Sequence, residues 1–103
     1  MINIRTLKKL QDGDGLTLKQ GKPISYKSGY QVATEGIATT DPEIAIIAVR
    51  KTYAGNCGIW FENGIYYIDK SHRVSTKRDA LALGRKCNQI SILKWSNMTL
   101  IYC

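Results

Sequence analysis

Two runs of aromatic and β-branched residues on either side of an Asn-Gly pair constrain this chain more than any other feature. The runs are Gly-Ile-Trp-Phe at 58–61 and Ile-Tyr-Tyr-Ile-Asp at 65–69, and Asn63-Gly64 lies between them. Such residues favour strands, and Asn-Gly favours the tight turns that join adjacent antiparallel strands. The sequence therefore predicts a β-hairpin here, with alternate side chains on opposite faces.

A helix is predicted on the N-terminal side of this hairpin. Asp41 can cap it, Pro42 suits its first position, and it is expected to run to about Tyr53. Its clearly polar residues occupy a small part of the circumference, so we expect it to be covered on more than one side. This apolar excess also predicts a homodimer.

A second helix is predicted on the C-terminal side of the hairpin. Ser75 or Thr76 can cap it, and it is expected to end near Cys87. Its apolar residues gather on one face. The opposite half carries four basic residues, which are Lys77, Arg78, Arg85 and Lys86.

The order of the predicted elements indicates the fold class. From residue 30 to 95 the order is strand, helix, strand, strand, helix, strand, which is the ferredoxin-like βαββαβ order. The 103 residues fit one domain, with a helix and hairpin extension at 1–28 and an α+β core at 29–103. We expect an antiparallel sheet with two main helices. The shorter predicted elements are a helix at 4–11 and strands at 16–19, 23–27, 30–34, 90–95 and 99–102.

The charge of the chain is unusual. There are 15 Lys and Arg against 8 Asp and Glu, a formal net charge of +7, which favours acidic partners. Basic residues are densest between Lys70 and Lys86, where Asp79 is the sole acid and Leu81 lies among the charges without an evident core partner. Either this region binds an acidic surface or it is a solvated helix face. The candidate binding residues are Lys70, Arg73, Lys77, Arg78, Leu81, Arg85 and Lys86.

Aromatic residues in the hairpin give a second candidate site. Tyr66 and Tyr67 lie where RNA-recognition modules place aromatics that stack on bases. Ile65 replaces the first aromatic of that motif and Asn63 replaces its leading basic residue. Because alternate residues of a strand must face the core, about half of these rings are expected to pack internally.

Catalytic and metal-binding patterns are not found. Cys57 lies just after the C-terminal end of a predicted helix, where the helix dipole does not favour a thiolate, and His72 is the single potential base. The three cysteines and His72 are too evenly spaced for a structural zinc site, which usually brings ligands in close pairs. No catalytic residue, metal or cofactor is predicted, and an enzyme centred on Cys57 is the weakest hypothesis.

Two resemblances bear on function. The segments 66–70, 75–80 and 90–92 resemble the rhythm of SPOR domains, which bind peptidoglycan, although the Arg73-Val74 pair comes later than in that family. The segments 58–69 and 83–92 resemble small accessory proteins of phages and prophages. This second resemblance implies a protein that blocks a host defence system, such as a CRISPR–Cas nuclease, by docking on it.

The function predicted first is therefore a non-enzymatic binding protein of phage or mobile-element origin. Its expected partner is a host or defence-system protein with an acidic surface. The alternative is a nucleic-acid-binding module that uses the second helix with Tyr66 and Tyr67. Because no apolar run approaches the roughly 18 residues of a membrane span and no export signal is evident, a cytoplasmic protein without a membrane partner is expected.

Overall fold

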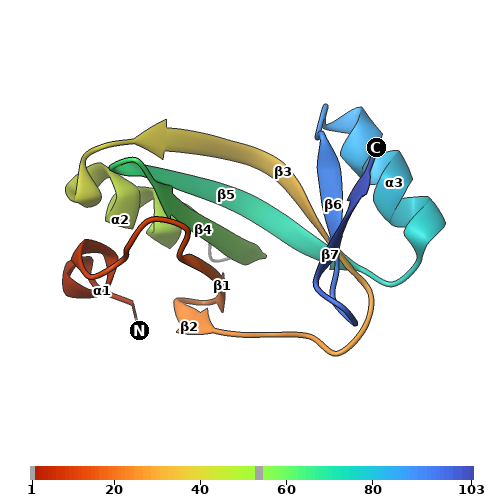
Figure 1. Cartoon of the computed structure of the whole chain (residues 1–103), viewed down its shortest axis with the longest axis horizontal. Coiled ribbons are helices and arrows are strands. Elements are labelled where there is room, and N and C mark those ends of the chain that lie inside the picture. The colour runs from red at the N-terminus through yellow and green to blue at the C-terminus, as the bar shows by residue number, and fades with distance from the viewer. Residues whose placement is uncertain (1, 53–54) are drawn as a thin grey trace.

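The computed structural model describes residues 2–52 and 55–103. Within these ranges the chain forms an α+β fold, with three helices and one antiparallel sheet of seven strands (Figure 1). The strands lie in the order β2-β1-β4-β5-β3-β6-β7. In chain order the elements are α1 (Ile4–Lys8), β1 (Gly15–Lys19), β2 (Lys22–Pro23), β3 (Tyr30–Thr39), α2 (Pro42–Lys51), β4 (Asn56–Glu62), β5 (Ile65–Val74), α3 (Lys77–Lys86), β6 (Ser91–Lys94) and β7 (Thr99–Tyr102).

β4 and β5 form the predicted hairpin. Phe61 pairs with Tyr66, and the turn residues Asn63 and Gly64 have φ angles of 52° and 75°. Positive φ at both central positions is the geometry that Asn-Gly turns adopt between antiparallel strands. β5 continues to Val74, well beyond its expected end, because β3 pairs with it from Tyr66 to Val74.

The predicted ferredoxin-like order is confirmed, and the sheet order shows how the strands are connected. α2 connects β3 to β4, and β5 lies between those two strands. α3 connects β5 to β6, and β3 lies between them. Each main helix therefore crosses over one intervening strand. The N-terminal strands extend the sheet beyond β4, and β7 extends it beyond β6.

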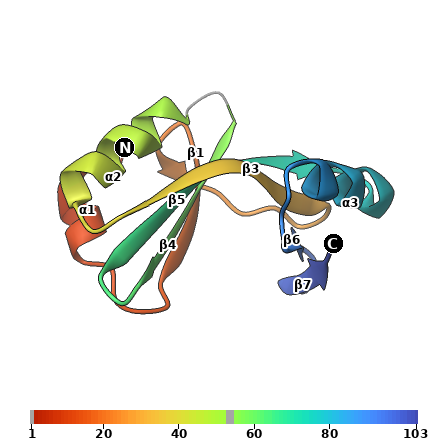
Figure 2. The same ribbon diagram turned by 90° about the horizontal axis from the view of Figure 1, so that it is seen from above.

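α2 and α3 cover the same face of the sheet at opposite ends of the molecule (Figure 1 and Figure 2). Ile68 and Val74 lie six positions apart on β5, so their side chains point to the same side. Ile68 belongs to a core cluster with α2, whereas Val74 packs against a second cluster with α3. The opposite side of the sheet carries none of the helices in the described part of the chain, and we call it the helix-free face.

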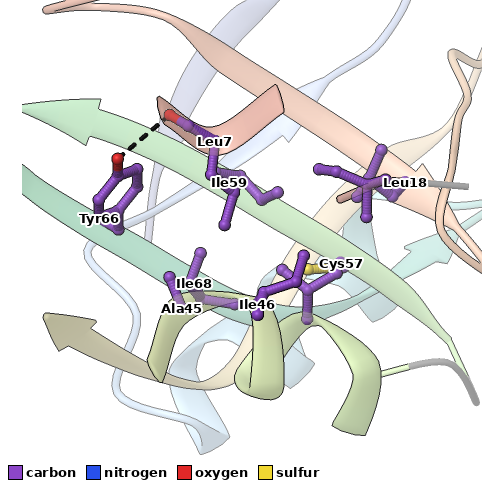
Figure 3. Close-up of a cluster of buried hydrophobic side chains, with 10 residues drawn as sticks. Leu7, Leu18, Ala45, Ile46, Cys57, Ile59, Tyr66 and Ile68 are labelled. Carbon is purple, nitrogen blue, oxygen red and sulfur yellow. Dashed lines mark hydrogen bonds between the residues drawn. The ribbon is translucent and has the colours of Figure 1, made fainter. Parts of the chain in front are cut away.

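The larger core joins both N-terminal helices to the centre of the sheet (Figure 3). Leu7 of α1 and Ile46 of α2 pack there with Ile59 of β4 and Ile68 of β5. The smaller core is formed by Val32, Ala80 and Ile92. Burying these side chains supplies the main favourable free energy of folding.

α2 begins as predicted, because Asp41 Oδ1 accepts a hydrogen bond of 2.8 Å from the Glu43 N–H. The helix ends at Lys51, and the expected end at Tyr53 lies outside the described residues. α1 covers a second side of α2, as its apolar circumference predicts. Ile44 and Ile47 nevertheless remain 49% and 51% exposed.

The strand expected at 23–27 is mostly absent, since β2 ends at Pro23. The chain instead crosses the helix-free face, where the Tyr26 ring packs edge-on against Trp95 at 5.5 Å between centroids. The Asn56 side-chain amide donates a hydrogen bond of 3.1 Å to the Tyr26 hydroxyl. These contacts hold the segment against the sheet in place of strand pairing.

Candidate functional site

α3 lies at one end of the long axis of the molecule (Figure 1), and four of its basic residues are exposed. Thr76 caps this helix, and Ala80 and Gly84 are buried against the sheet. The opposite side therefore faces solvent, as the helical period predicts. We define the basic face of α3 as its exposed residues Lys77, Arg78, Arg85 and Lys86.

The charges of this basic face are almost unneutralised. Within residues 2–52 and 55–103, the single ion pair joins Arg78 Nε to Asp79 Oδ1 at 3.5 Å. Both side chains are largely exposed, and such pairs contribute little free energy. The positive potential predicted for this helix is therefore available to a partner.

Leu81 does not belong to this surface. The sequence prediction placed it among the charges without a core partner, but it is half-buried and packs against the cluster of Val32, Ala80 and Ile92. The apolar side of α3 is wide enough to include position 81. The expectation that Leu81 has no core partner is therefore wrong, and its role as a docking residue stays a prediction.

Lys70 and Arg73 lie on β5, away from the basic face. The Arg73 guanidinium donates hydrogen bonds to the Ser28 carbonyl and hydroxyl oxygens at 3.0 and 3.1 Å, and it lies 5.5 Å from the centre of the Tyr26 ring. Arg73 thus holds the segment before β3. Lys70 is half-buried and lines a hollow beside α2. The predicted cluster is reduced to the four residues of α3.

Tyr66 and Tyr67 do not form a stacking pair. Tyr66 is buried, and its hydroxyl donates a hydrogen bond of 3.1 Å to the Leu7 carbonyl (Figure 3). Tyr67 points to the helix-free face and is 43% exposed. Strand alternation places the two rings on opposite faces of the sheet, so they do not share one stacking surface, and only the Tyr67 ring is open to solvent.

The helix-free face carries a groove that the sequence did not predict. Its volume is about 670 Å³. The segment after β2 lines one part, and the β6–β7 hairpin lines another. We define the groove by its lining residues, which are Gly15, Leu16, Thr17, Pro23, Ile24, Ser25, Gly58, Ile59, Trp60, Asp69, Leu93, Trp95, Met98 and Leu100.

Asp69 carries the single charge among those lining residues. It pairs across the sheet with Gly58 on β4 and Gly36 on β3. A Cβ atom on Gly58 would overlap Asp69 Oδ1, and one on Gly36 would lie 3.2 Å from the Asp69 Cβ. The two glycines thus leave room for the carboxyl group, a common reason for glycine within a strand.

Burial raises the pKa of Asp69 above its ordinary value of 3.8, and a hydrogen bond from the Gly58 backbone opposes this shift. An apolar environment disfavours the charged form of an acid unless a cation lies nearby. No Lys, Arg or His nitrogen of the described chain lies within 4.0 Å of this carboxylate. The groove therefore contains an acidic group without a cationic partner.

Cys57 shows the properties of a packed thiol. It is buried in the larger core, and burial raises its pKa to about 11. The protonated form therefore dominates near neutral pH, and a protonated thiol is a poor nucleophile. Within the described residues, no three His, Cys, Asp or Glu side chains group closely enough to hold a metal ion.

Comparison with known proteins adds no relative. No protein-family model, no curated protein and no solved structure matches this chain. The described helices are also too short or too polar to cross a membrane.

Proposed function

We propose that this chain is a non-enzymatic binding protein that docks on an acidic partner protein through the basic face of α3. The observation that carries the proposal is the exposure of Lys77, Arg78, Arg85 and Lys86, of which Arg78 alone meets a carboxylate within the described residues. Rigid presentation supports it as well, because Ala80 and Gly84 fix the helix to the sheet. A fixed array loses less conformational entropy on binding than mobile side chains on a loop.

A protein partner is favoured over RNA by the position of the aromatics. Tyr66 is buried and Tyr67 lies on the helix-free face, so neither ring can extend the basic face of α3. Base-stacking rings are what most single-stranded RNA readers combine with positive charge. The resemblance to small phage proteins makes a cytoplasmic host-defence protein, such as a CRISPR–Cas nuclease, the first partner class to test.

Charge reversal at the basic face tests the proposal. A variant with Glu at Lys77, Arg78, Arg85 and Lys86 is expected to lose binding to a purified defence protein and protection of phage in infected cells. The control reverses the same number of exposed charges at Arg5, Lys8, Lys9 and Lys22, at the other end of the molecule, and should retain both. Equal activity of the two folded variants would contradict the proposal.

Nucleic acid is the second candidate partner, because the same four cations could contact phosphates. Binding through four phosphates would weaken about 100-fold between 50 and 200 mM salt. Retention on duplex DNA or single-stranded RNA with this salt dependence, lost in the variant at the basic face, would support this candidate. Binding of the defence protein that persists after nuclease treatment would instead support the protein partner.

Self-association is a further part of the proposal. Ile44 and Ile47 on α2 and Ile37 on β3 are each about half exposed, and contiguous apolar surface often marks an interface. A homodimer through α2 predicts concentration-dependent sedimentation that Ile44→Lys with Ile47→Lys abolishes. If the protein sediments as a monomer at high concentration, the proposed homodimer is wrong, whereas the proposed role of the basic face of α3 is unaffected.

A further inference from the structure

The groove on the helix-free face lies on the opposite side of β6 from α3. Ile92 of β6 packs under α3, whereas its neighbour Leu93 lines the groove. The basic face of α3 and the groove thus form two separate surfaces with different chemistry. An inference about the groove therefore stands independently of the proposed function.

We propose that the groove binds an Arg or Lys side chain carried by an apolar segment of a partner protein, with Asp69 as the residue that pairs with the cation. Three features of the groove carry the proposal. They are the Asp69 carboxyl group at its base, the Trp60 indole beside it, and the apolar side chains of Met98 and Leu100 at its rim. Each of these features selects one property of the occupant.

The charge in the floor selects a cation. Asp69 lines a groove whose other residues are uncharged and mostly apolar, with glycine at both of its cross-strand positions. An ionised carboxylate in such surroundings is unfavourable until an opposite charge pairs with it. Arg73 is held at Ser28, and the basic face of α3 lies on the other side of the sheet. The cation that pairs with this carboxylate would therefore come from outside the described chain.

The indole of Trp60 selects the type of cation. Its Nε1–H donates a hydrogen bond of 3.3 Å to Glu62 Oε2, and a Cβ on Gly15 would lie 3.0 Å from its ring. Trp60 is thus held against β1 while 45% of it stays exposed. Tryptophan is the best partner for cation–π contacts, and Arg pairs with a carboxylate through two hydrogen bonds.

The rim selects a protein segment. Met98 and Leu100 of the β6–β7 hairpin are 61% and 59% exposed, and they border the same groove as Trp60 and Trp95. A large exposed apolar surface often marks a site of protein–protein interaction. A small hydrated cation would leave most of this surface in water.

Tryptophan fluorescence measures occupancy directly, because both tryptophans of the chain line the groove. The probes are two capped eight-residue peptides in which Leu and Phe flank a central residue. The central residue is Arg in one peptide and citrulline in the other. Citrulline keeps the shape of Arg but is neutral. We expect the Arg peptide to bind at least about tenfold more tightly than the citrulline peptide, because only Arg forms a charge-assisted contact with the carboxylate.

Asp69→Asn should remove this preference, so that both peptides bind equally weakly. Glu43→Gln changes the net charge equally on α2, away from the groove, and should preserve the preference. A second variant, Leu100→Lys, puts a competing cation on the rim and should weaken the Arg peptide at least about tenfold.

Three results would overturn the proposal. The first is equal binding of both peptides, or no fluorescence change up to about 1 mM. The second is binding of N-acetylarginine amide as tight as that of the Arg peptide, which would make the occupant a small molecule. The third is a dimer that Asp69→Asn dissociates, which would make the occupant a second copy of this chain.

Discussion

The indole Nε1–H of Trp95 donates a hydrogen bond of 2.9 Å to Oε1 of Gln31, a residue 64 positions earlier. The amide nitrogen of Gln31 in turn donates to Asn56 Oδ1 at 2.9 Å and to Ser71 Oγ at 3.0 Å. One buried side chain thus links the polar groups of β3, β4 and β5 to the residue that follows β6. This network lies beside the groove and fixes one of its two tryptophans.

Gln31→Leu is expected to lower the free energy of unfolding by about 2–4 kcal/mol. The substitution leaves the polar atoms of Trp95, Asn56 and Ser71 without their partner, and each unsatisfied buried group costs about 1–3 kcal/mol. Urea unfolding measures the change. Gln11→Leu, at an exposed position, should change stability by less than about 0.5 kcal/mol. Similar values for both variants would show that the hydrogen bonds of Gln31 contribute little to stability.

Asp69→Asn is expected to stabilise the protein near neutral pH. Since burial raises the folded pKa of Asp69 above its unfolded value of 3.8, the stability linked to its proton is fully present below that value. This stability is lost as the pH rises through the folded pKa. Melting temperatures of the two proteins should therefore converge at about pH 3 and diverge above it. A variant that is less stable at all pH values would contradict the direction of the shift.

Leu81→Ala is expected to lower the free energy of unfolding by about 1–2 kcal/mol, because a half-buried side chain loses its contacts with the smaller core. Lys77→Ala, at an exposed position one turn earlier, should change stability by less than about 0.5 kcal/mol. Chemical denaturation separates the two. If Leu81→Ala is neutral for stability but weakens partner binding, Leu81 belongs to the docking surface after all.

Cys57 is expected to resist iodoacetamide at about pH 8, because its thiol is buried and its pKa is raised to about 11. Cys87 and Cys103 are only half-buried and should react first. Peptide mass spectrometry after timed labelling measures the three rates. Labelling of Cys57 as fast as that of the other two in the folded protein would contradict this assignment.

Local sequence patterns were sufficient for much of the fold. Asn63-Gly64 identified the central hairpin, and Asp41 and the pair Ser75-Thr76 identified the starts of both main helices, because turn and capping preferences depend on a few neighbouring residues. Strand lengths were predicted less well. Residues 35–39 were not expected in a strand, yet they pair with β5 after a register shift that follows Ala33.

Only part of the candidate surfaces could be predicted in the same way. The basic face of α3 follows from helical periodicity within ten residues, so the sequence was sufficient to find it. The sequence did not predict that Tyr66 is the buried ring. The alternation of side chains along a strand shows that one of two neighbouring rings faces the core, but it does not show which one. Gly36 and Gly58 were the available signals for the groove, since glycine within a strand often marks a close approach, but their positions beside Asp69 depend on the register.

The sequence by itself determined the helix starts, the hairpin turn and the excess of positive charge, because each depends on residues that are neighbours along the chain. Only the tertiary structure decided that the side chains of Leu81 and Tyr66 pack in the hydrophobic cores. It also decided that Asp69, Trp60 and Leu100 share one groove. These residues come from strands whose pairing depends on contacts between distant segments, and a shift of register by one residue would send every side chain of a strand to the other face.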